Sequence, residues 1–183
     1  MHACTRVWKI SSIVLGLIIV GLGVDSHFNS DWRAVNKRDD PCQQKALNIY
    51  GSKDKWCPHI AIEEYFVAIT IICFILSVIS LGYSFKVEKS TKKMKKLDKY
   101  YHCLAALLLI IAGSLYFASA IQTLNMRLQG RNGELQLRTT EKAIAGLLAI
   151  VQALIYAVAA FFIGKESSSN ETNFNNTMIS LNY

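Results

Sequence analysis

Apolar residues in this chain are gathered into long blocks without charged residues. They do not alternate with polar residues, as they would in a half-buried strand, and they are not confined to one face, as they would be in an amphipathic helix. Three blocks, at 65–85, 100–124 and 143–164, contain no Asp, Glu, Lys or Arg. A helix needs about 20 mainly apolar residues, rising about 1.5 Å each, to cross the hydrocarbon of a membrane. A buried helix of a soluble protein would need a polar face that these blocks lack. Each block therefore predicts one membrane-spanning helix.

The first apolar segment is shorter. It reaches span length over residues 7–24 only if Lys9 extends its charged end to the membrane surface. Two interpretations stay open. A cleaved signal peptide typically has basic residues, here Arg6 and Lys9, ahead of a short apolar stretch, and a small-x-small triplet, here Gly-Leu-Gly at 21–23, behind it. Small residues on one helical face and the Trp8 anchor favour a retained helix. With that helix, the sequence predicts an all-α membrane protein built as a bundle of four transmembrane helices.

Charge gives this bundle an orientation. The chain has 183 residues, 52% of them hydrophobic, and a formal net charge of +7. Residues 86–100 hold seven lysines and two acidic residues, so this stretch carries five of those net charges. Lys and Arg are enriched in loops on the cytosolic side of a membrane. We therefore predict that the basic loop 86–99 and both termini are cytosolic, within one membrane domain over 1–164, and we expect no nucleic-acid partner.

This orientation places residues 25–64 and 125–142 outside as two loops and leaves 165–183 as a flexible cytosolic tail. Two glycosylation sequons in the tail, at Asn170 and Asn175, disagree, because such sites are used only outside the cytosol. We interpret them as chance triplets in a segment rich in Ser, Asn and Thr. A sugar on either residue would invert the orientation.

The cysteines divide between the first outer loop and the membrane. Cys42 and Cys57 lie in the loop, whereas Cys4, Cys73 and Cys103 lie at or within the spans. Because the exterior is oxidising, we predict a disulfide between Cys42 and Cys57. In the chain-entropy description, closing a loop of about 15 residues stabilises a fold by about 3 kcal/mol. Cys4 and Cys103, at the cytosolic edge, are candidates for palmitoylation.

Small residues within the blocks predict close helix packing. In the last block they recur every four residues, at Ala145, Ala149, Ala153 and Ala157. In the third block they recur every seven, at Ala106, Gly113 and Ala120. Such rows let two helix backbones approach closely. Gln152 beside the first row, and Gln122 in the third block, are each expected to make an interhelical hydrogen bond worth about 1 kcal/mol.

No arrangement of catalytic or metal-binding residues stands out. The four histidines are scattered, and no H-E-x-x-H, C-x-x-C or paired-carboxylate spacing brings them together. Glu63 and Glu64 begin the second span, where a helix N-terminus favours negative charge. No charged residue lies deep in a span, and such residues mark ion and proton pathways. We expect no enzyme activity, cofactor or metal, and a channel or transporter accessory subunit is the remotest alternative.

The third and fourth spans, YYHCLAALLLIIAGSLYFASA and AIAGLLAIVQALIYAVAAFF, resemble those of MARVEL-type four-helix proteins. The chain is also similar to the small claudin-like tetraspans of insect septate junctions. It has Trp32, Cys42 and Trp56-Cys57 in its first loop, without the Gly-Leu-Trp triplet of claudins. The resemblance implies a non-enzymatic organiser of lateral septate or occluding junctions in the plasma membrane that contributes to the epithelial barrier. A vesicle-trafficking or membrane-apposition tetraspan is the alternative.

Candidate contacts lie on both sides of the membrane. Outside, the aromatic candidates are Trp32, Tyr50 and Trp56, which either anchor a partner or pack on their own loop. Inside, four loop lysines are candidates for contact with inner-leaflet lipid: Lys92, Lys93, Lys95 and Lys96. The final residues, with Leu181 and Tyr183, offer a possible ligand for a PDZ scaffold. The expected partners are the lipid bilayer and other junctional membrane proteins or further copies of the chain.

Overall fold

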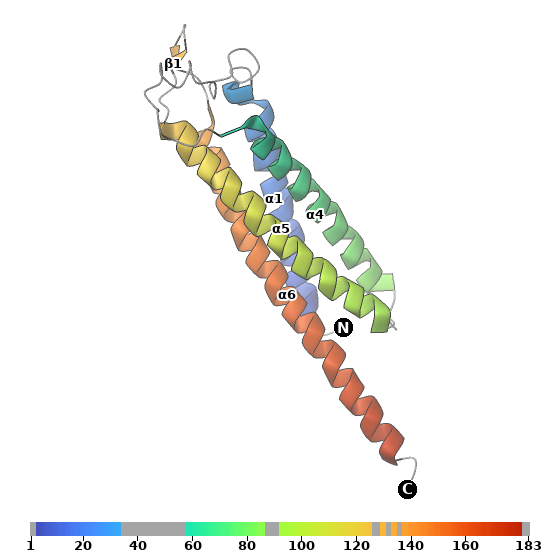
Figure 1. Cartoon of the computed structure of the whole chain (residues 1–183). Helices are drawn as coiled ribbons and strands as arrows, with labels where there is room; N and C mark the ends of the chain where they lie inside the picture. Colours follow the sequence, from blue (N-terminus) through green and yellow to red (C-terminus); the bar gives the residue numbers. More distant parts are fainter. Residues whose placement is uncertain are drawn as a thin grey trace.

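The computed structural model describes residues 3–33, 58–86, 92–125, 129–130, 133–134 and 137–180. These residues form a bundle of four long helices in which chain neighbours run antiparallel (Figure 1). The helices are α1 (Ala3–Phe28), α4 (Ile60–Lys86), α5 (Lys92–Asn125) and α6 (Thr139–Ser180). Two short strands, β1 (Gln129–Gly130) and β2 (Gly133–Glu134), pair between α5 and α6.

Four helices of this chain are long and apolar enough to cross a membrane. The predicted four-helix membrane bundle is therefore confirmed, and the protein has the architecture of an integral membrane protein. Each helix is longer than its apolar block, because polar residues at the ends of a block continue the backbone hydrogen bonding. α6 is the extreme case, since it runs past the predicted end of its span at Gly164 and takes in most of the predicted tail.

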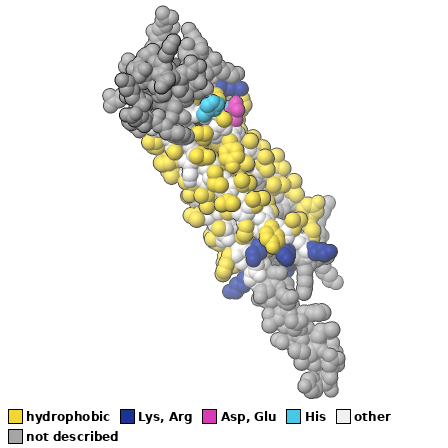
Figure 2. Space-filling view, viewed as in Figure 1, with side chains coloured by type: hydrophobic (Ala, Val, Ile, Leu, Met, Phe, Trp, Pro, Cys, Tyr) yellow, Lys and Arg dark blue, Asp and Glu magenta, His cyan; other side chains and the backbone are white. Residues whose placement is uncertain are grey.

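The helices form a ring in which α1 lies between α4 and α6, and α5 lies between the same two helices on the opposite side. Large apolar side chains face outward, among them Leu104, Leu107, Leu154 and Phe161, all more than half exposed. Figure 2 shows the resulting apolar band on the face of the bundle that is in view. The interior holds many small side chains. This distribution suits lipid, where helices associate by close packing and lipid tails cover the larger apolar residues.

The closest helix contact joins α5 and α6 at two glycines. A Cβ atom built on Gly113 would lie 2.8 Å from the carbonyl oxygen of Gly146, and one built on Gly146 would lie 2.9 Å from the carbonyl oxygen of Gly113. Both distances are shorter than real Cβ contacts. A side chain at either position would push the helices apart, so these glycines set the spacing of α5 and α6.

The predicted alanine row on α6 is correct over most of its length. Three of its positions are completely buried: Ala145, Ala149 and Ala153. Ala157, the fourth position, is exposed. A step of four residues turns a helix by about 400°, so the row drifts about 40° around the helix at each step. The buried face continues instead through Tyr156 and Ala160.

Candidate functional site

Polar side chains inside the bundle gather towards its two ends. The loop end is where α1 leads to α4 and α5 leads to α6. The basic end is opposite, where α4 leads to α5 and the chain begins (Figure 1). Each end contains a buried ionic cluster that joins three helices, so the two clusters are the first places to look for a functional role.

Glu63 is the centre of the loop-end cluster. Its carboxylate accepts a hydrogen bond of 2.6 Å from Lys142 Nζ and lies 3.1 Å from His27 Nδ1. Lys142 also donates to Ser30 Oγ at 3.1 Å, and Ser30 donates to the Leu137 carbonyl. Glu63, Lys142 and His27 are 0%, 1% and 4% exposed. The cluster therefore ties together α1, α4 and α6 in the interior of the bundle.

Buried ion pairs of this kind hold a structure together because separating the paired charges inside it costs free energy. Taking one partner away leaves an unpaired buried charge, which costs about 3–5 kcal/mol. Lys142 and His27 approach the same carboxylate from two different helices. A rotation or shift of α1, α4 or α6 would break at least one of these contacts, so the cluster fixes the arrangement of the three helices at the loop end.

Glu63 lies in the first turn of α4, as expected for an acidic residue at a helix N-terminus. The sequence did not predict that Glu63 is buried, whereas its neighbour Glu64 is exposed. The sequence predicts part of this cluster, namely that its three residues lie at the same end of the bundle. In an antiparallel bundle the end of α1 and the starts of α4 and α6 reach the same edge, so His27, Glu63 and Lys142 must lie at one level. Their pairing depends on the rotation of each helix, which the apolar blocks do not specify.

A second contact supports the loop end nearer the surface. Arg138, the residue before α6, forms an ion pair with Asp25 of α1. Arg138 has φ of 48°, in the left-handed region where a residue other than glycine is strained. Asp25 also accepts a hydrogen bond of 2.6 Å from Asn29 Nδ2. The ion pair holds the start of α6 against the end of α1.

Lys9 is at the centre of the cluster at the basic end. Its Nζ donates to Asp98 Oδ2 at 2.6 Å and to Ser80 Oγ at 2.9 Å, and Ser80 donates to Asp98 Oδ1 at 2.7 Å. His102 Nδ1 lies 3.4 Å from the same carboxylate. The expectation that Lys9 extends to the membrane surface is wrong, since it is 2% exposed. Asp98, from the end of the basic stretch, supplies the negative charge that holds it inside.

A group of hydroxyls lies next to this cluster. Ser77 Oγ is hydrogen-bonded to Tyr101 OH at 2.8 Å and also to Tyr156 OH. Both tyrosines donate to the Cys73 carbonyl. These contacts join α4 to α5 and α6.

The two glutamines behave differently. Gln152 Nε2 donates to the Ser12 carbonyl at 3.0 Å, which links α6 to α1. Gln122 Nε2 is buried and has no hydrogen-bond partner among the described residues. The expected interhelical hydrogen bond of Gln122 is therefore absent from this part of the chain.

An apolar layer separates the polar groups of the two ends. On one side lies the Gln152–Ser12 contact, and on the other Ser26 Oγ is hydrogen-bonded to Tyr116 OH at 2.8 Å. Ser12 and Ser26 are 14 positions apart on α1, which corresponds to about 21 Å along a helix. The core residues around this layer are Ile19, Leu109, Ala112, Ala145 and Ala149. Thr70 bonds back to carbonyls of its own helix. Among the described residues, no continuous polar path joins the two ends.

Trp32 does not form part of an exposed contact surface. Its side chain is 0% exposed, and its backbone N–H donates to Ser30 Oγ at 3.2 Å. Of the two interpretations of Trp32, its burial fits packing on its own part of the chain and not an exposed anchor for a partner. The reason is that Ser30, bonded to Lys142 and to the Leu137 carbonyl, draws this stretch onto the bundle end.

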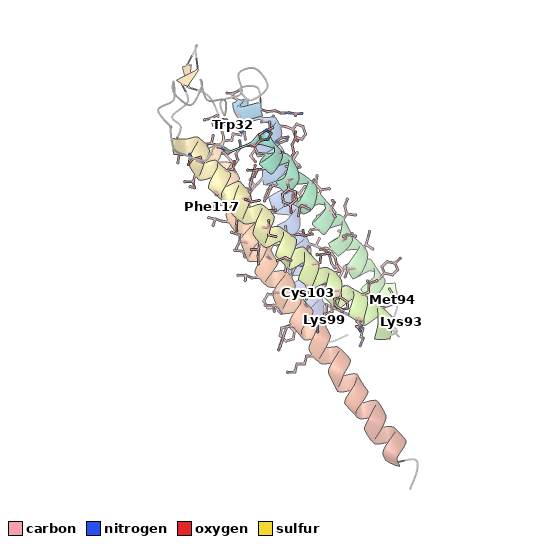
Figure 3. All side chains as sticks on the ribbon, in the orientation of Figure 1. Trp32, Lys93, Met94, Lys99, Cys103 and Phe117 are labelled. Carbon is pink, nitrogen blue, oxygen red and sulfur yellow. The ribbon has the colours of Figure 1, made fainter. Side chains whose placement is uncertain are left out.

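Some other predicted contact residues lie outside the described residues: Tyr50, Trp56, Cys42, Cys57, Leu181 and Tyr183. Of the predicted lipid-contacting lysines, Lys93 and Lys96 are exposed and Lys95 is half-buried, and Lys92 begins α5. Cys103 is exposed on α5, and Cys4 belongs to the first turn of α1. Figure 3 shows Lys93, Lys99 and Cys103 towards the basic end and Trp32 at the loop end.

The described residues contain no group of three or more His, Cys, Asp or Glu side chains that could hold a metal ion. No protein-family model matches the chain, and neither a curated protein nor a solved structure is significantly similar to it. The MARVEL-type and claudin-like resemblances therefore stay predictions.

Proposed function

We propose that this protein is a non-enzymatic membrane organiser that acts through its loop end at lateral cell–cell junctions and contributes to an epithelial barrier. The observation that carries the proposal is the buried cluster of Glu63, Lys142 and His27. It fixes three helices at the end of the bundle where α1 ends and where α4 and α6 begin. A fixed platform of this kind suits a protein that presents loops to a partner.

The interior argues against transport. Permeation needs a path of polar groups or water, and intramembrane charges usually line such a path. Here the charges of each end are paired with one another, and the apolar layer around Ile19 and Leu109 lies between them. A static bundle that supports its loops fits these features better than a channel subunit does.

The charge distribution supports an exterior position for the loop end. Exposed lysines gather at the opposite, basic end, at Lys93, Lys96, Lys99 and Lys165. Lysines close to the ends of transmembrane helices favour the cytosolic side. With the basic end in the cytosol, the first loop faces the oxidising exterior, where a Cys42–Cys57 disulfide is stable.

The test compares cysteine variants in a polarised epithelium that depends on the protein. We expect Cys42→Ser/Cys57→Ser to lose junctional placement and to raise paracellular permeability, because the first loop loses its cross-link. Cys103→Ser, which changes an exposed thiol at the basic end, is the matched control and leaves the barrier unchanged. A double variant that localises and seals normally contradicts the junction proposal.

A vesicle-trafficking tetraspan is the second candidate, and the exposed Lys93, Lys96 and Cys103 at the basic end favour it. In that case the same experiment gives the opposite pattern. Cys103→Ser, or neutralisation of Lys93 and Lys96, then misroutes the protein, whereas the outer-loop cysteines are dispensable for its placement.

A further inference from the structure

Four exposed lysines at the basic end have no ion-pair partner in the described part of the chain. Lys93, Lys96 and Lys99 project from the start of α5, and Lys165 lies on α6. Asp98, the acidic residue between them in the sequence, is engaged by Lys9 and Ser80 inside the bundle. This face therefore carries positive charge that no described acidic side chain neutralises.

Two of these lysines, Lys93 and Lys96, lie next to exposed apolar residues of α5. Residues four apart share a helix face, so Lys93 lies one turn before Leu97 on the same face, and Lys96 lies one turn before Tyr100. Leu97 and Tyr100 are 64% and 61% exposed, and the exposed apolar face continues one turn further at Leu104. An exposed tyrosine between charged and apolar residues is typical of the membrane boundary. Figure 2 shows the basic side chains at the edge of the apolar band.

Lys99 extends this charged edge from α5 to α6. A Cβ atom built on Gly164 would lie 3.2 Å from Lys99 Nζ and 3.3 Å from its Cε. The lysine side chain therefore rests against the backbone of α6 where Gly164 leaves room, next to Lys165 in the sequence. The positively charged surface therefore includes lysines from both α5 and α6.

We propose that this basic edge binds the phosphate headgroups of anionic membrane lipids, with their acyl chains along Leu97 and Leu104. The exposed ammonium groups recognise the phosphate, and the adjoining apolar face receives the chains. A lipid can bind to the lysines and to the apolar face at the same time, whereas a soluble anion can bind only to the lysines. This inference is independent of the proposed junctional function, because it concerns the opposite end of the bundle.

The test measures lipid selectivity of the full chain in nanodiscs that contain phosphatidylcholine and phosphatidylserine. Spin-labelled forms of the two lipids report their relative association with the protein. We expect the wild type to prefer phosphatidylserine and Lys96→Gln/Lys99→Gln to lose much of this preference. A lysine near an anionic surface contributes a factor of about five, equivalent to ~1 kcal/mol, which is the expected upper loss for each lysine removed.

Arg33→Gln is the control, because it removes one positive charge at the loop end, where Arg33 lies over the Phe28 ring. It should leave the preference unchanged, and thermal unfolding by circular dichroism should show that the lysine variant keeps its helices. Equal association of both lipids with the wild type, or an unchanged preference in Lys96→Gln/Lys99→Gln, overturns the proposal. So does loss of the preference when inorganic phosphate is added at constant ionic strength, since the site would then take a free anion.

Discussion

At the scale of single residues, Lys142 shows how a charge becomes structural inside a membrane bundle. It contacts the Glu63 carboxylate on α4 and the hydroxyl of Ser30, which follows the end of α1, so one side chain reaches two neighbouring segments. The carboxylate in turn meets His27. The same residue types at the membrane surface would contribute little, because exposed ion pairs are worth 1 kcal/mol or less.

Lys142→Met is therefore expected to be strongly destabilising. The variant leaves Glu63 as a buried carboxylate with His27 alone as partner, and the expected loss in free energy of unfolding is about 3–5 kcal/mol. Unfolding by denaturant in detergent micelles, followed by circular dichroism, measures it. Lys165→Met removes an exposed lysine from the same helix and should change the free energy by less than about 0.5 kcal/mol.

A double variant separates the ion pair from its surroundings. In Glu63→Gln/Lys142→Met neither charge stays buried, so much of the lost stability should return. If Lys142→Met unfolds at the same denaturant concentration as the wild type, the cluster does not hold the loop end.

At the scale of the helices, Gly113 and Gly146 set the spacing of α5 and α6. An alanine normally stabilises a helix by up to about 1 kcal/mol relative to glycine. At Gly113 the added methyl group meets the backbone of α6, so Gly113→Ala should be destabilising instead, by about 1–3 kcal/mol. Gly21→Ala is the matched control, because nothing lies within 4 Å of its Cβ position.

The two variants are thus expected to change the unfolding midpoint in opposite directions. The midpoint of Gly21→Ala should be unchanged or raised, and that of Gly113→Ala lowered. A rise for Gly113→Ala would contradict the close contact between α5 and α6.

α1 provides the second prediction at this scale. It supplies Lys9 to Asp98, His27 to Glu63 and the Ser12 carbonyl to Gln152. Cleavage after Gly23 by a signal peptidase would remove Lys9 and Ser12, and would leave Asp98 and Gln152 without their partners on α1. We therefore expect the intact mass of the purified protein to include α1. A mature chain that begins after Gly23 would restore the signal-peptide interpretation.

The four helices could be predicted because membrane thickness demands a long apolar stretch and the chain contains four. Contacts between helices were harder to predict. The four-residue spacing identified Ala145 and Ala149, but not the point at which the row leaves the interface, before Ala157. Gly113 appeared in a seven-residue repeat, and its backbone contact depends on the crossing of two helices. Lys9 was misplaced, because its partner Asp98 is far away in the sequence.

At the scale of the whole molecule, the two ends differ in chemistry. The loop end has buried ionic contacts, and the basic end has exposed lysines at the edge of the lipid-facing surface. This asymmetry favours one orientation in the membrane, with the basic end in the cytosol.

The sequons near the end of the chain test that orientation. With α6 leading into the cytosol, Asn170 and Asn175 never meet the glycosylation machinery, so treatment with a glycosidase should leave the electrophoretic mobility of the protein unchanged. An extracellular control glycoprotein from the same cells should shift. A shift of this protein, lost in Asn170→Gln/Asn175→Gln, would place the basic end outside.

The most direct test of the junctional proposal is the position of the endogenous protein in a polarised epithelium, imaged against markers of lateral junctions and endosomes. The proposal predicts a continuous line at cell contacts, and increased paracellular permeability when the protein is depleted. Confinement to internal puncta, with an intact barrier after depletion, would contradict it and favour the trafficking function.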